Sequence, residues 1–478
     1  MLDRYDAIIV GSGPNGFAAA ILMQSQGLKT LLLEAADSVG GGMRSKSLTL
    51  PGFTHDVCAA IHPMALASPY FSRLPLQDYG LSYTYAPYEL AHPLSVKEAA
   101  FLDRSMESTA AALGKDSQAY TDLFAPFVQQ WPKLAHDILG PLRMPRHPLL
   151  MAQFGSKGLQ SGTQIASRFQ TREAKALWAG LCGHGMLPLS SLTTAAIGLV
   201  LGSVGHRFGW PLAQGGSQSV ANALAAYYQS LGGEILLNTP FTDRKQLPDH
   251  QVLMLNMTPK QVLAIDGLDL RPGYRRQLEA YRQGVGIFKL DWALSAPIPF
   301  QNSYAQQAAT LHIGGEMAEI ARAEALVSQG KHAEQPFVLL SQQSQFDPSR
   351  APKGQHTAWA YCHVPLGSTQ DCTAAIEAQI ERFAPGFRDC ILARHRFNTH
   401  ELEAYNPNYV GGDINGGIMD LTQLYTRPSF SLTPYRTSNR SIYLSSSATP
   451  PGGGVHGMCG YHAARIALED HFHIKVSL

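Results

Sequence analysis

The feature that most constrains the fold is a group of three glycines near the start of the chain. Gly11, Gly13 and Gly16 are spaced as G-x-G-x-x-G, directly after the apolar run at 6–10. A stretch rich in Ala, Leu and Met follows them, and then a second apolar run at 29–34. A strand, a glycine turn, a helix and a second strand within about 30 residues are typical of a βαβ dinucleotide-binding unit.

Each glycine of the motif has a separate physical task. Gly11 allows a sharp turn, Gly13 lets the backbone approach a pyrophosphate, and Gly16 allows the helix to pack closely on the strand. The positive end of the helix then faces the anionic pyrophosphate. We therefore expect the whole turn to contact the ligand: Gly11, Gly13, Pro14, Asn15 and Gly16.

An acidic residue closes the second apolar run. Glu34 lies 21 positions after Gly13 (34 − 13). An acid at this place accepts hydrogen bonds from a ribose diol and repels a 2′-phosphate. We expect Glu34 and the neighbouring Ala35 to contact the ribose. A glycine turn in an unrelated α/β fold is the simpler alternative.

A second glycine cluster follows Glu34 and helps to distinguish an FAD-binding domain from an NAD-binding one. It reads Gly40-Gly41-Gly42-Met43-Arg44. Its glycines can bring the backbone close to a diphosphate, and Arg44 offers a fixed positive charge with a forked donor. An NAD domain does not need a second phosphate clamp here, so the cluster favours FAD. A surface turn with a solvated arginine is the alternative.

A third glycine loop lies near the end of the chain, at 448–457, between a predicted strand at 441–447 and a predicted helix at 460–472. Such a loop directs backbone amides at a ligand above the helix N-terminus. We expect Gly454, Val455 and His456 to contact that ligand.

These motifs resemble the phytoene desaturase-like FAD oxidoreductases of the amine oxidase and phytoene dehydrogenase superfamily. The segment from Glu34 to Arg44 resembles their E-x(5–6)-G-G-x-x-R pattern. Among their branches, which include carotenoid desaturases and retinol saturase, the pyridine nucleotide-disulphide oxidoreductase domain-containing branch is most similar. Its likeness is seen at 50–56, 357–369 and 449–464. The sequence Val-His-Gly-Met-Cys-Gly-Tyr at 455–461 departs from the carotenoid desaturases.

The resemblance implies further contacts and two candidate catalytic residues. Phe241 would contact the adenine side, and Ala60 and Ile61 would lie beneath the flavin. His456 could pass protons or steady anionic reduced flavin, and His62 has a similar position. For both histidines, a packed and hydrogen-bonded structural role is the alternative. The predicted cofactor contacts also include Gly41, Gly42, Met43 and Arg44.

The α/β pattern occurs at the start, middle and end of the chain, so we predict an α/β fold assembled from separated segments. A Rossmann-type FAD-binding domain, of the glutathione-reductase-like, amine oxidase and phytoene desaturase type, would comprise 1–66, 206–268 and 428–478. An interleaved α+β substrate-binding domain would comprise 67–205 and 269–427.

Composition excludes several functions. With 37 basic and 36 acidic side chains, the net charge of +1 gives no field for nucleic acid. The six cysteines contain no C-x-x-C pair, which excludes a thioredoxin-reductase-like redox centre and an ordinary zinc knuckle. We predict no metal site. Free thiols favour a reducing compartment.

We expect a cytoplasmic protein without a signal peptide, because charges at 1–6 run straight into the first strand. The longest apolar stretch, 192–204, is too short for a membrane span. The segment 134–167 interleaves Leu, Met and Phe with Lys, Arg and His, so it could rest on a membrane surface. A helical part of the substrate domain is the alternative.

The resemblance implies hydride exchange between flavin N5 and a substrate C–C or C–N bond, by desaturation or saturation. An apolar, terpenoid or lipid-like small molecule is the favoured substrate. Oxygen, a quinone or NAD(P) could be the electron acceptor. The rival hypotheses are an amine oxidase, a non-catalytic flavin-binding or chaperone-like protein, and an NAD-dependent dehydrogenase.

Overall fold

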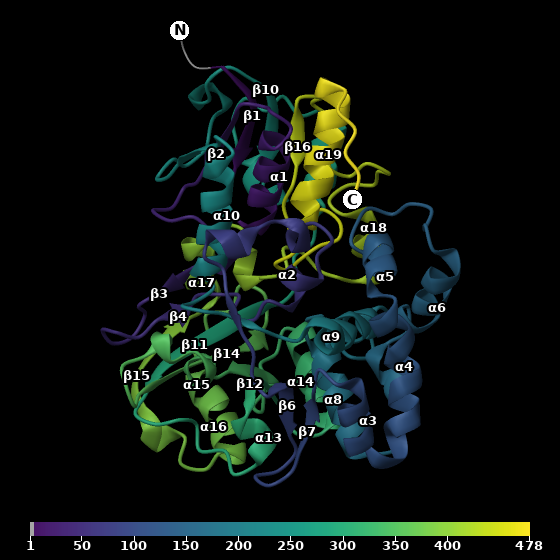
Figure 1. The fold of residues 1–478 in the computed structure, drawn as a ribbon, viewed down its shortest axis with the longest axis vertical. Coiled ribbons are helices and arrows are strands. Elements are labelled where there is room, and N and C mark those ends of the chain that lie inside the picture. The colour runs from purple at the N-terminus through teal and green to yellow at the C-terminus, as the bar shows by residue number, and fades with distance from the viewer. Residues whose placement is uncertain (1–3) are drawn as a thin grey trace.

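The computed structural model describes residues 4–478 and contains two main sheets. Figure 1 shows one part of the molecule above, with both the start and the end of the chain, and a larger part below. The upper sheet has five strands, all paired in parallel. In spatial order they are β16 (Ile442–Leu444), β10 (His250–Leu255), β1 (Tyr5–Val10), β2 (Thr30–Leu33) and β9 (Glu234–Leu236).

The lower sheet has seven strands and is mostly antiparallel, with one parallel pairing between β12 and β6. In spatial order it contains β15 (Ile391–Phe397), β11 (Gly286–Leu294), β14 (His356–Val364), β13 (Val338–Ser341), β12 (Ala308–Ile313), β6 (Tyr88–Pro93) and β7 (Ala99–Leu102). Two short pairs complete the strands: β3 (Ser45–Lys46) with β4 (His55–Asp56), and β5 (Tyr83–Thr84) with β8 (Leu212–Ala213).

Helices cover both sheets. Those associated with the upper sheet include α1 (Pro14–Gln24), α10 (Gln218–Ser230), α11 (Pro259–Leu263), α12 (Pro272–Glu279) and α19 (Met458–Phe472). Beside the lower sheet lie α3 (Met106–Ala112), α4 (Ser117–Gln129), α5 (Trp131–Ile138), α6 (Pro148–Gly158), α7 (Gly162–Ala166), α8 (Arg172–Gly183) and α9 (Thr194–Phe208). The remaining helices are α2 (Pro63–Ala67), α13 (Ser303–Gln306), α14 (Met317–Ser328), α15 (Gln343–Phe346), α16 (Thr373–Phe383), α17 (Thr399–Tyr405) and α18 (Leu421–Thr426).

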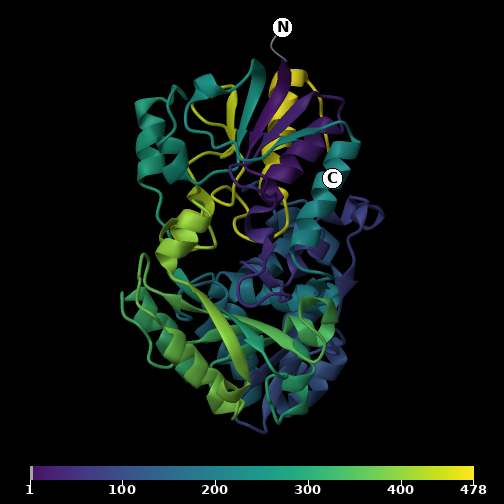
Figure 2. The same cartoon turned by 90° about the vertical axis from the view of Figure 1, so that its left-hand side faces the viewer.

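The Rossmann-type fold predicted from the sequence is confirmed by the parallel sheet and its helices. The strands of the upper sheet come from the start, middle and end of the chain, and those of the lower sheet from the stretches between. Figure 2 shows the same two parts from the side. The residue limits of the two domains stay a prediction.

Some element limits differ from those expected. The first helix begins at Pro14, three residues earlier than predicted, because proline fits the first turn of a helix without losing a needed donor. It ends at Gln24, and Gly27 takes its left-handed conformation, with φ +83°, in the turn beyond. The last helix likewise begins early, at Met458.

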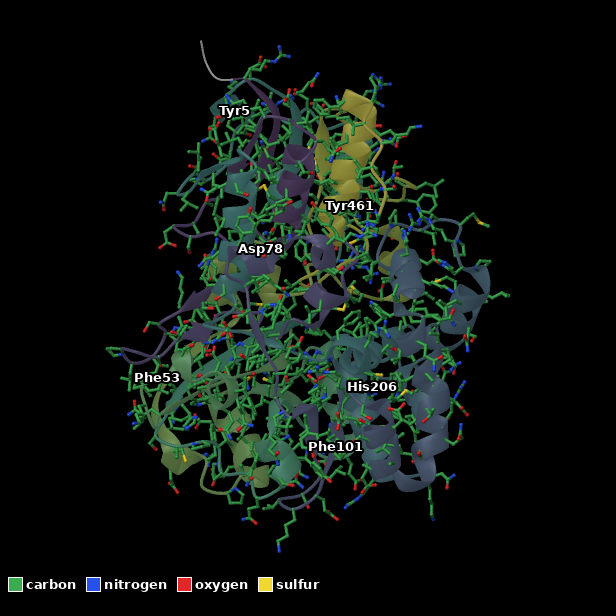
Figure 3. The ribbon with its side chains drawn as sticks, viewed as in Figure 1. Tyr5, Phe53, Asp78, Phe101, His206 and Tyr461 are labelled. Carbon is green, nitrogen blue, oxygen red and sulfur yellow. The ribbon has the colours of Figure 1, made fainter. Side chains whose placement is uncertain are left out.

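The segment 134–167, predicted to be helical or to rest on a membrane, contains the end of α5 and the helices α6 and α7. Three of its apolar side chains are strongly exposed: Leu142 at 58%, Met144 at 89% and Leu149 at 87%. Figure 3 shows the side chains of both parts, with Tyr461 above and His206 below. In residues 4–478 we find no helix of the length and apolarity needed to cross a bilayer.

The first and last helices of the upper part pack on each other through backbone contact. A Cβ atom added to Gly460 of α19 would lie only 1.7 Å from the Asn15 carbonyl oxygen of α1. No side chain can be accommodated at that distance, so glycine is required there by packing alone.

We predict that Gly460→Ala destabilises the protein by about 1–3 kcal/mol or more, as overpacking does. Gly155→Ala is a matched control, because Gly155 also lies in a helix but an added Cβ would meet nothing within 4 Å. The control should gain about 0.5–1 kcal/mol from helix propensity. Thermal unfolding of both variants measures the effects, and equal melting temperatures would contradict the predicted contact.

Candidate cofactor site

The first glycine turn lies where the parallel strands end. Gly11 N donates to the Leu33 carbonyl at 2.7 Å, so the turn starts at the carboxyl edge of β1 and β2. Gly11 has φ +95°, a conformation that L-residues with a side chain rarely adopt. A Cβ on Gly16 would lie 1.8 Å from the Gly11 carbonyl oxygen. The fold itself therefore requires both glycines.

Gly13 differs from its neighbours, because the fold does not require a glycine there. Its φ and ψ of −68° and 177° suit any residue. An added Cβ would meet only the side-chain amide nitrogen of Asn256, at 3.1 Å, a close contact that a small shift of this side chain would relieve. A missing side chain at this point leaves room for something outside the protein to approach the backbone. This cradle fits a phosphate group.

The N-terminus of α1 is also prepared for an anion. No side chain caps the helix, and no acidic residue lies in its first turn. The buried Asn15 Oδ1 has no hydrogen-bond partner among the described residues. A helix start with uncompensated positive character is a favourable place for a phosphate.

The second glycine cluster lies against the first. Gly40 N donates to the Ser12 carbonyl oxygen and to Ser12 Oγ, at 3.2 and 3.1 Å. A Cβ on Gly41, which has φ +55°, would come within 3.0 Å of the Gly13 Cα. Gly41, Gly42 and Met43 form the single 3₁₀ turn η1 (Gly41–Met43). The two clusters, at 11–16 and 40–42, thus form one backbone surface, which we call the glycine surface.

Glu34 and Arg44, two predicted ligand contacts, form a buried ion pair. Arg44 Nη2 lies 2.9 Å from Glu34 Oε1, and the side chains are 4% and 9% exposed. Glu34 Oε2 accepts from the Ser12 N–H at 3.0 Å and the Ser12 hydroxyl at 2.5 Å. Arg44 therefore orients the acid, a task that the sequence did not reveal. Ala35, next to Glu34, is exposed.

The segment 55–62 runs alongside the second cluster. Val57 N donates to the Arg44 carbonyl at 2.9 Å, and Ala59 N donates to the Gly42 carbonyl at 3.0 Å. The predicted flavin contacts Ala60 and Ile61 follow directly, Ala60 being buried. These bonds bring the segment to the glycine surface.

His62, at the end of this segment, is fully packed. Its Nε2 hydrogen-bonds Ser217 Oγ at 2.9 Å, and its Nδ1 is buried without a partner among the described residues. Burial lowers the pKa of His62 to about 4, so the imidazole is neutral at physiological pH. The free Nδ1 leaves one hydrogen-bonding position for a ligand or water.

The third glycine loop is organised around His456. His456 Nδ1 accepts from the Met458 N–H at 3.0 Å, at the start of α19. The Ser68 hydroxyl donates to the His456 carbonyl at 2.6 Å. Burial lowers the pKa of this imidazole to about 4. These bonds favour the structural role for His456, and a catalytic role stays a prediction. Gly454 is exposed and Val455 partly exposed.

Phe241 is a buried residue of the upper part. It is 6% exposed and packs in the apolar cluster beneath the sheet with Val10 and Leu33, the last residues of β1 and β2. A direct contact with an adenine stays a prediction.

Sequence reasoning missed two polar residues at this site. Asn256 follows β10 at the carboxyl edge of the sheet, and its amide donates to the Gly11 carbonyl at 3.2 Å. Its position as the polar end of a buried strand was a usable signal, because ligands bind at this edge. Arg427 is 1% exposed, and its Nη1 lies 3.1 Å from where a Cβ of Gly452 would be. It donates to the Ser447 carbonyl at 2.8 Å, so a buried cation lies behind the third loop.

No group of three or more His, Cys, Asp or Glu in residues 4–478 could hold a metal ion.

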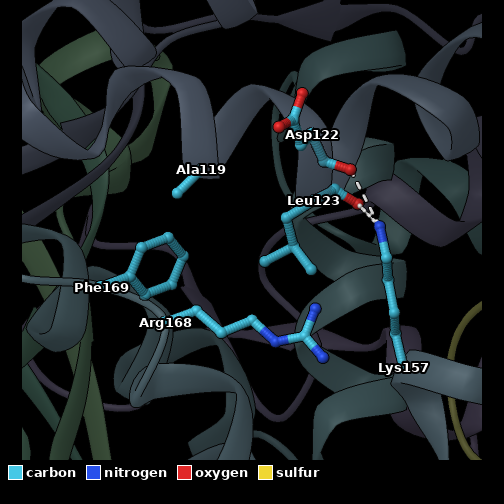
Figure 4. A pocket seen from close by; sticks show the side chains of 6 residues that line it. All are labelled: Ala119, Asp122, Leu123, Lys157, Arg168 and Phe169. Atoms are coloured by element: carbon cyan, nitrogen blue, oxygen red, sulfur yellow. Dashed lines mark hydrogen bonds between the residues drawn. The ribbon is translucent and has the colours of Figure 1, made fainter.

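Figure 4 shows a pocket formed by helices α4 and α6 and the residues that follow α7. In it Lys157 donates to the Asp122 carbonyl oxygen at 2.8 Å. None of the predicted site residues lines this pocket.

Comparison with known proteins agrees with the Rossmann-type fold. The family model for an NAD(P)-binding Rossmann-like domain matches residues 9–74. Pyridine nucleotide-disulfide oxidoreductase domain-containing protein 2 of Mus musculus is 24% identical over 98% of this chain and 94% of its own length. The lycopene-forming phytoene desaturase of a Paracoccus species is 23% identical over 97% of each chain.

Solved structures show the same fold. Putrescine oxidase bound to putrescine superposes with a TM-score of 0.61 at 16% identity, covering 99% of this chain and all of the other. The resemblance to phytoene desaturase-like proteins, and to the pyridine nucleotide-disulphide branch, is thereby confirmed.

We predict that Gly13→Val abolishes cofactor retention without unfolding the protein, because the fold has room for a side chain where the pyrophosphate would lie. Gly273→Ala is a control for the loss of a glycine outside the site, since Gly273 lies in α12 and its Cβ would meet nothing within 4 Å. Bound flavin per protein and melting temperature are the measurements. A fully loaded Gly13→Val protein would contradict the phosphate cradle.

We predict that His456→Ala keeps its cofactor but alters flavin reduction. Loss of the acceptor at the start of α19 should also cost about 0.5–2 kcal/mol of stability, as loss of an N-terminal cap does. His456→Asn supplies a shorter acceptor and should recover stability. Thermal unfolding and the midpoint potential of the bound flavin separate the two effects. An unchanged potential in both variants would leave His456 a purely structural residue.

Proposed function

We propose that this protein is an FAD-dependent oxidoreductase of the phytoene desaturase-like type. The main supporting observation is Gly13, at the uncapped start of α1: its backbone conformation suits any residue, and the only close neighbour of an added Cβ would be the movable Asn256 amide. The adjoining glycine cluster at 40–42 extends this backbone surface beyond the ribose-binding acid, which supports FAD over NAD. The relatives named as oxidoreductases and desaturases support the same class.

The bound FAD would supply hydride transfer at N5, between the cofactor and a substrate C–C or C–N bond. The protein's own residues bind and orient. Gly13 and the start of α1 hold the pyrophosphate, and Glu34, fixed by Arg44 and Ser12, receives the ribose. Ala60 and Ile61 would lie under the ring system, since they follow the residues that are hydrogen-bonded to the glycine surface.

The third loop would stabilise negative charge at the ring edge. Its amides lie at the start of α19, whose positive end is formed by backbone N–H groups. Arg427 adds a positive charge behind the loop, and the buried Asp413 carboxylate is its electrostatic neighbour. A buried cation beside such a loop favours the anionic reduced form of a flavin.

Amine oxidation is the second candidate function. It is favoured by the structural likeness to putrescine oxidase and by the sheet described in the next subsection. A non-catalytic flavin-binding or chaperone-like role and an NAD-dependent dehydrogenase are the further alternatives. For the electron acceptor, oxygen, a quinone and NAD(P) each fit the proposal.

The deciding experiment is the visible spectrum of the purified protein, followed by acid release of the chromophore. We expect oxidised-flavin bands near ~370 and ~450 nm and FAD in the supernatant, as for other non-covalent flavoproteins. A colourless protein that also takes up no added FAD would overturn the proposal. Binding of NAD in its place would support the dehydrogenase alternative.

A further inference from the structure

The two faces of the seven-stranded sheet differ sharply in chemistry. One face is apolar and includes Phe288, Leu290 and Trp292 of β11, with Leu340 of β13 in the same cluster. Helix α16 packs against this face at β12 and β14 and runs along the outside of the sheet in Figure 2. The opposite face carries the alternate residues of the same strands, and many of these are polar.

A row of five polar residues crosses five adjacent strands on that second face. The strand register places His395 opposite Asp291, Asp291 opposite Trp359, and Trp359 opposite Ser341. Ser341 in turn lies opposite Thr310. Directly paired side chains lie about 5 Å apart, so the row is continuous. It ends at the next strand, where Leu90 is the partner of Thr310.

Every residue of this row has a buried polar atom without a partner among the described residues. The five atoms are His395 Nδ1, Asp291 Oδ1, Trp359 Nε1, Ser341 Oγ and Thr310 Oγ1. Buried polar groups in folded proteins are nearly always hydrogen-bonded, and single exceptions call for an explanation. Five neighbours in one row indicate a common partner.

The row adjoins the candidate cofactor site through the segment 55–62. His55 Nδ1 lies 3.8 Å from Asp291 Oδ1, and Asp56 Oδ2 accepts from Arg350 Nη2 at 2.6 Å. The next residue, Val57, is hydrogen-bonded to Arg44 of the glycine surface. One short segment therefore separates the row from the predicted flavin position.

The exposure of the row and the charge of the residues around it favour a ligand that donates hydrogen bonds. Asp291 and Ser341 in the middle of the row are fully buried, Trp359 and Thr310 are 8% and 5% exposed, and His395 at the edge of the sheet is partly exposed. Lys289 pairs with Asp291, and Arg350 lies between Asp56 and Asp347. Burial lowers the pKa of His55 to about 3, so it adds no charge. When all of these groups are ionised, the three carboxylates outnumber the two cations, so the cluster has a net charge of −1.

We propose that the polar row is the substrate-recognition surface, and that the substrate is a polar molecule whose hydroxyl or amino groups hydrogen-bond along it. This inference rests on the proposed function, since it places the substrate beside the flavin, and it replaces the apolar substrate favoured from the sequence. A long hydrocarbon would leave all five polar atoms unpaired, which makes its binding unfavourable. Asp291 is the acceptor for the first donor group, and Ser341 and Thr310 bind groups further along.

The test uses the FAD-loaded protein and four probes of one chain length: hexanediol, aminohexanol, diaminohexane and hexane. Binding is followed by perturbation of the flavin absorption bands during titration. We expect the three polar probes to perturb the spectrum and hexane to leave it unchanged. Ser341→Ala should lower the affinity for the tightest-binding polar probe about three- to tenfold, which is the effect of losing one hydrogen bond.

Ser203→Ala is the matched control. Ser203 also has a buried hydroxyl without a partner among the described residues, but it lies in α9 outside the row. Its substitution should leave probe affinity unchanged. Both variants should retain or gain thermal stability, because each removes an unpaired buried hydroxyl.

Three results would overturn the inference: hexane binding as tightly as the polar probes, no polar probe perturbing the spectrum, or equal affinities in Ser341→Ala and the unsubstituted protein. The last result would show that trapped water satisfies the row. Each of these three results would leave the proposed function intact, provided that the protein is fully loaded with FAD. Absence of FAD from the purified protein would instead contradict the proposed function itself.

Discussion

The site depends on backbone contact between the first and last helices of the upper part. A Cβ on Gly460 would overlap the Asn15 carbonyl, and a Cβ on Gly16 would overlap the Gly11 carbonyl. The Gly460 contact lets α19 approach α1 closely, and the Gly16 contact lets α1 start close to the end of β1, so that the third glycine loop and the first share one edge of the sheet. Neither loop could form a cofactor surface with the other if these helices were held apart by side chains. The close approach thus converts distant segments of the chain into one site.

The local part of this site could be predicted from the sequence. The spacing of Gly11, Gly13 and Gly16 between two apolar runs needs only neighbouring residues to be interpreted. The second glycine cluster was predicted to approach a diphosphate, but its contact with the first cluster was not predicted, although the ends of β1 and β2 are adjacent in any such unit. The start of α1 was predicted too late, because Pro14 was treated as part of the turn when its ring suits the first helical position.

The remaining features depend on which distant strands become neighbours. Asn256 reaches Gly11 only because β10 pairs with β1. The polar row needs the register of five strands, each from a different segment. Alternation of Lys289 and Asp291 with Leu290 and Trp292 was readable in the sequence as a strand with two unlike faces. The residue that lies opposite Asp291 could not be predicted, because local periodicity contains no information about the register between strands.

The segment 55–62 explains how the two sheets can act together. Its first residues are held to the lower sheet by charge: the Asp56–Arg350 pair is 0% and 1% exposed, so removing either partner would leave an uncompensated buried charge. The pKa of Asp56 is lowered despite its burial, because Arg350 and the Ser217 N–H both stabilise the carboxylate. Its later residues are held to the glycine surface by backbone bonds. A group recognised by the row would therefore be positioned relative to the cofactor by a short, doubly anchored strip of chain, with little freedom to shift between them.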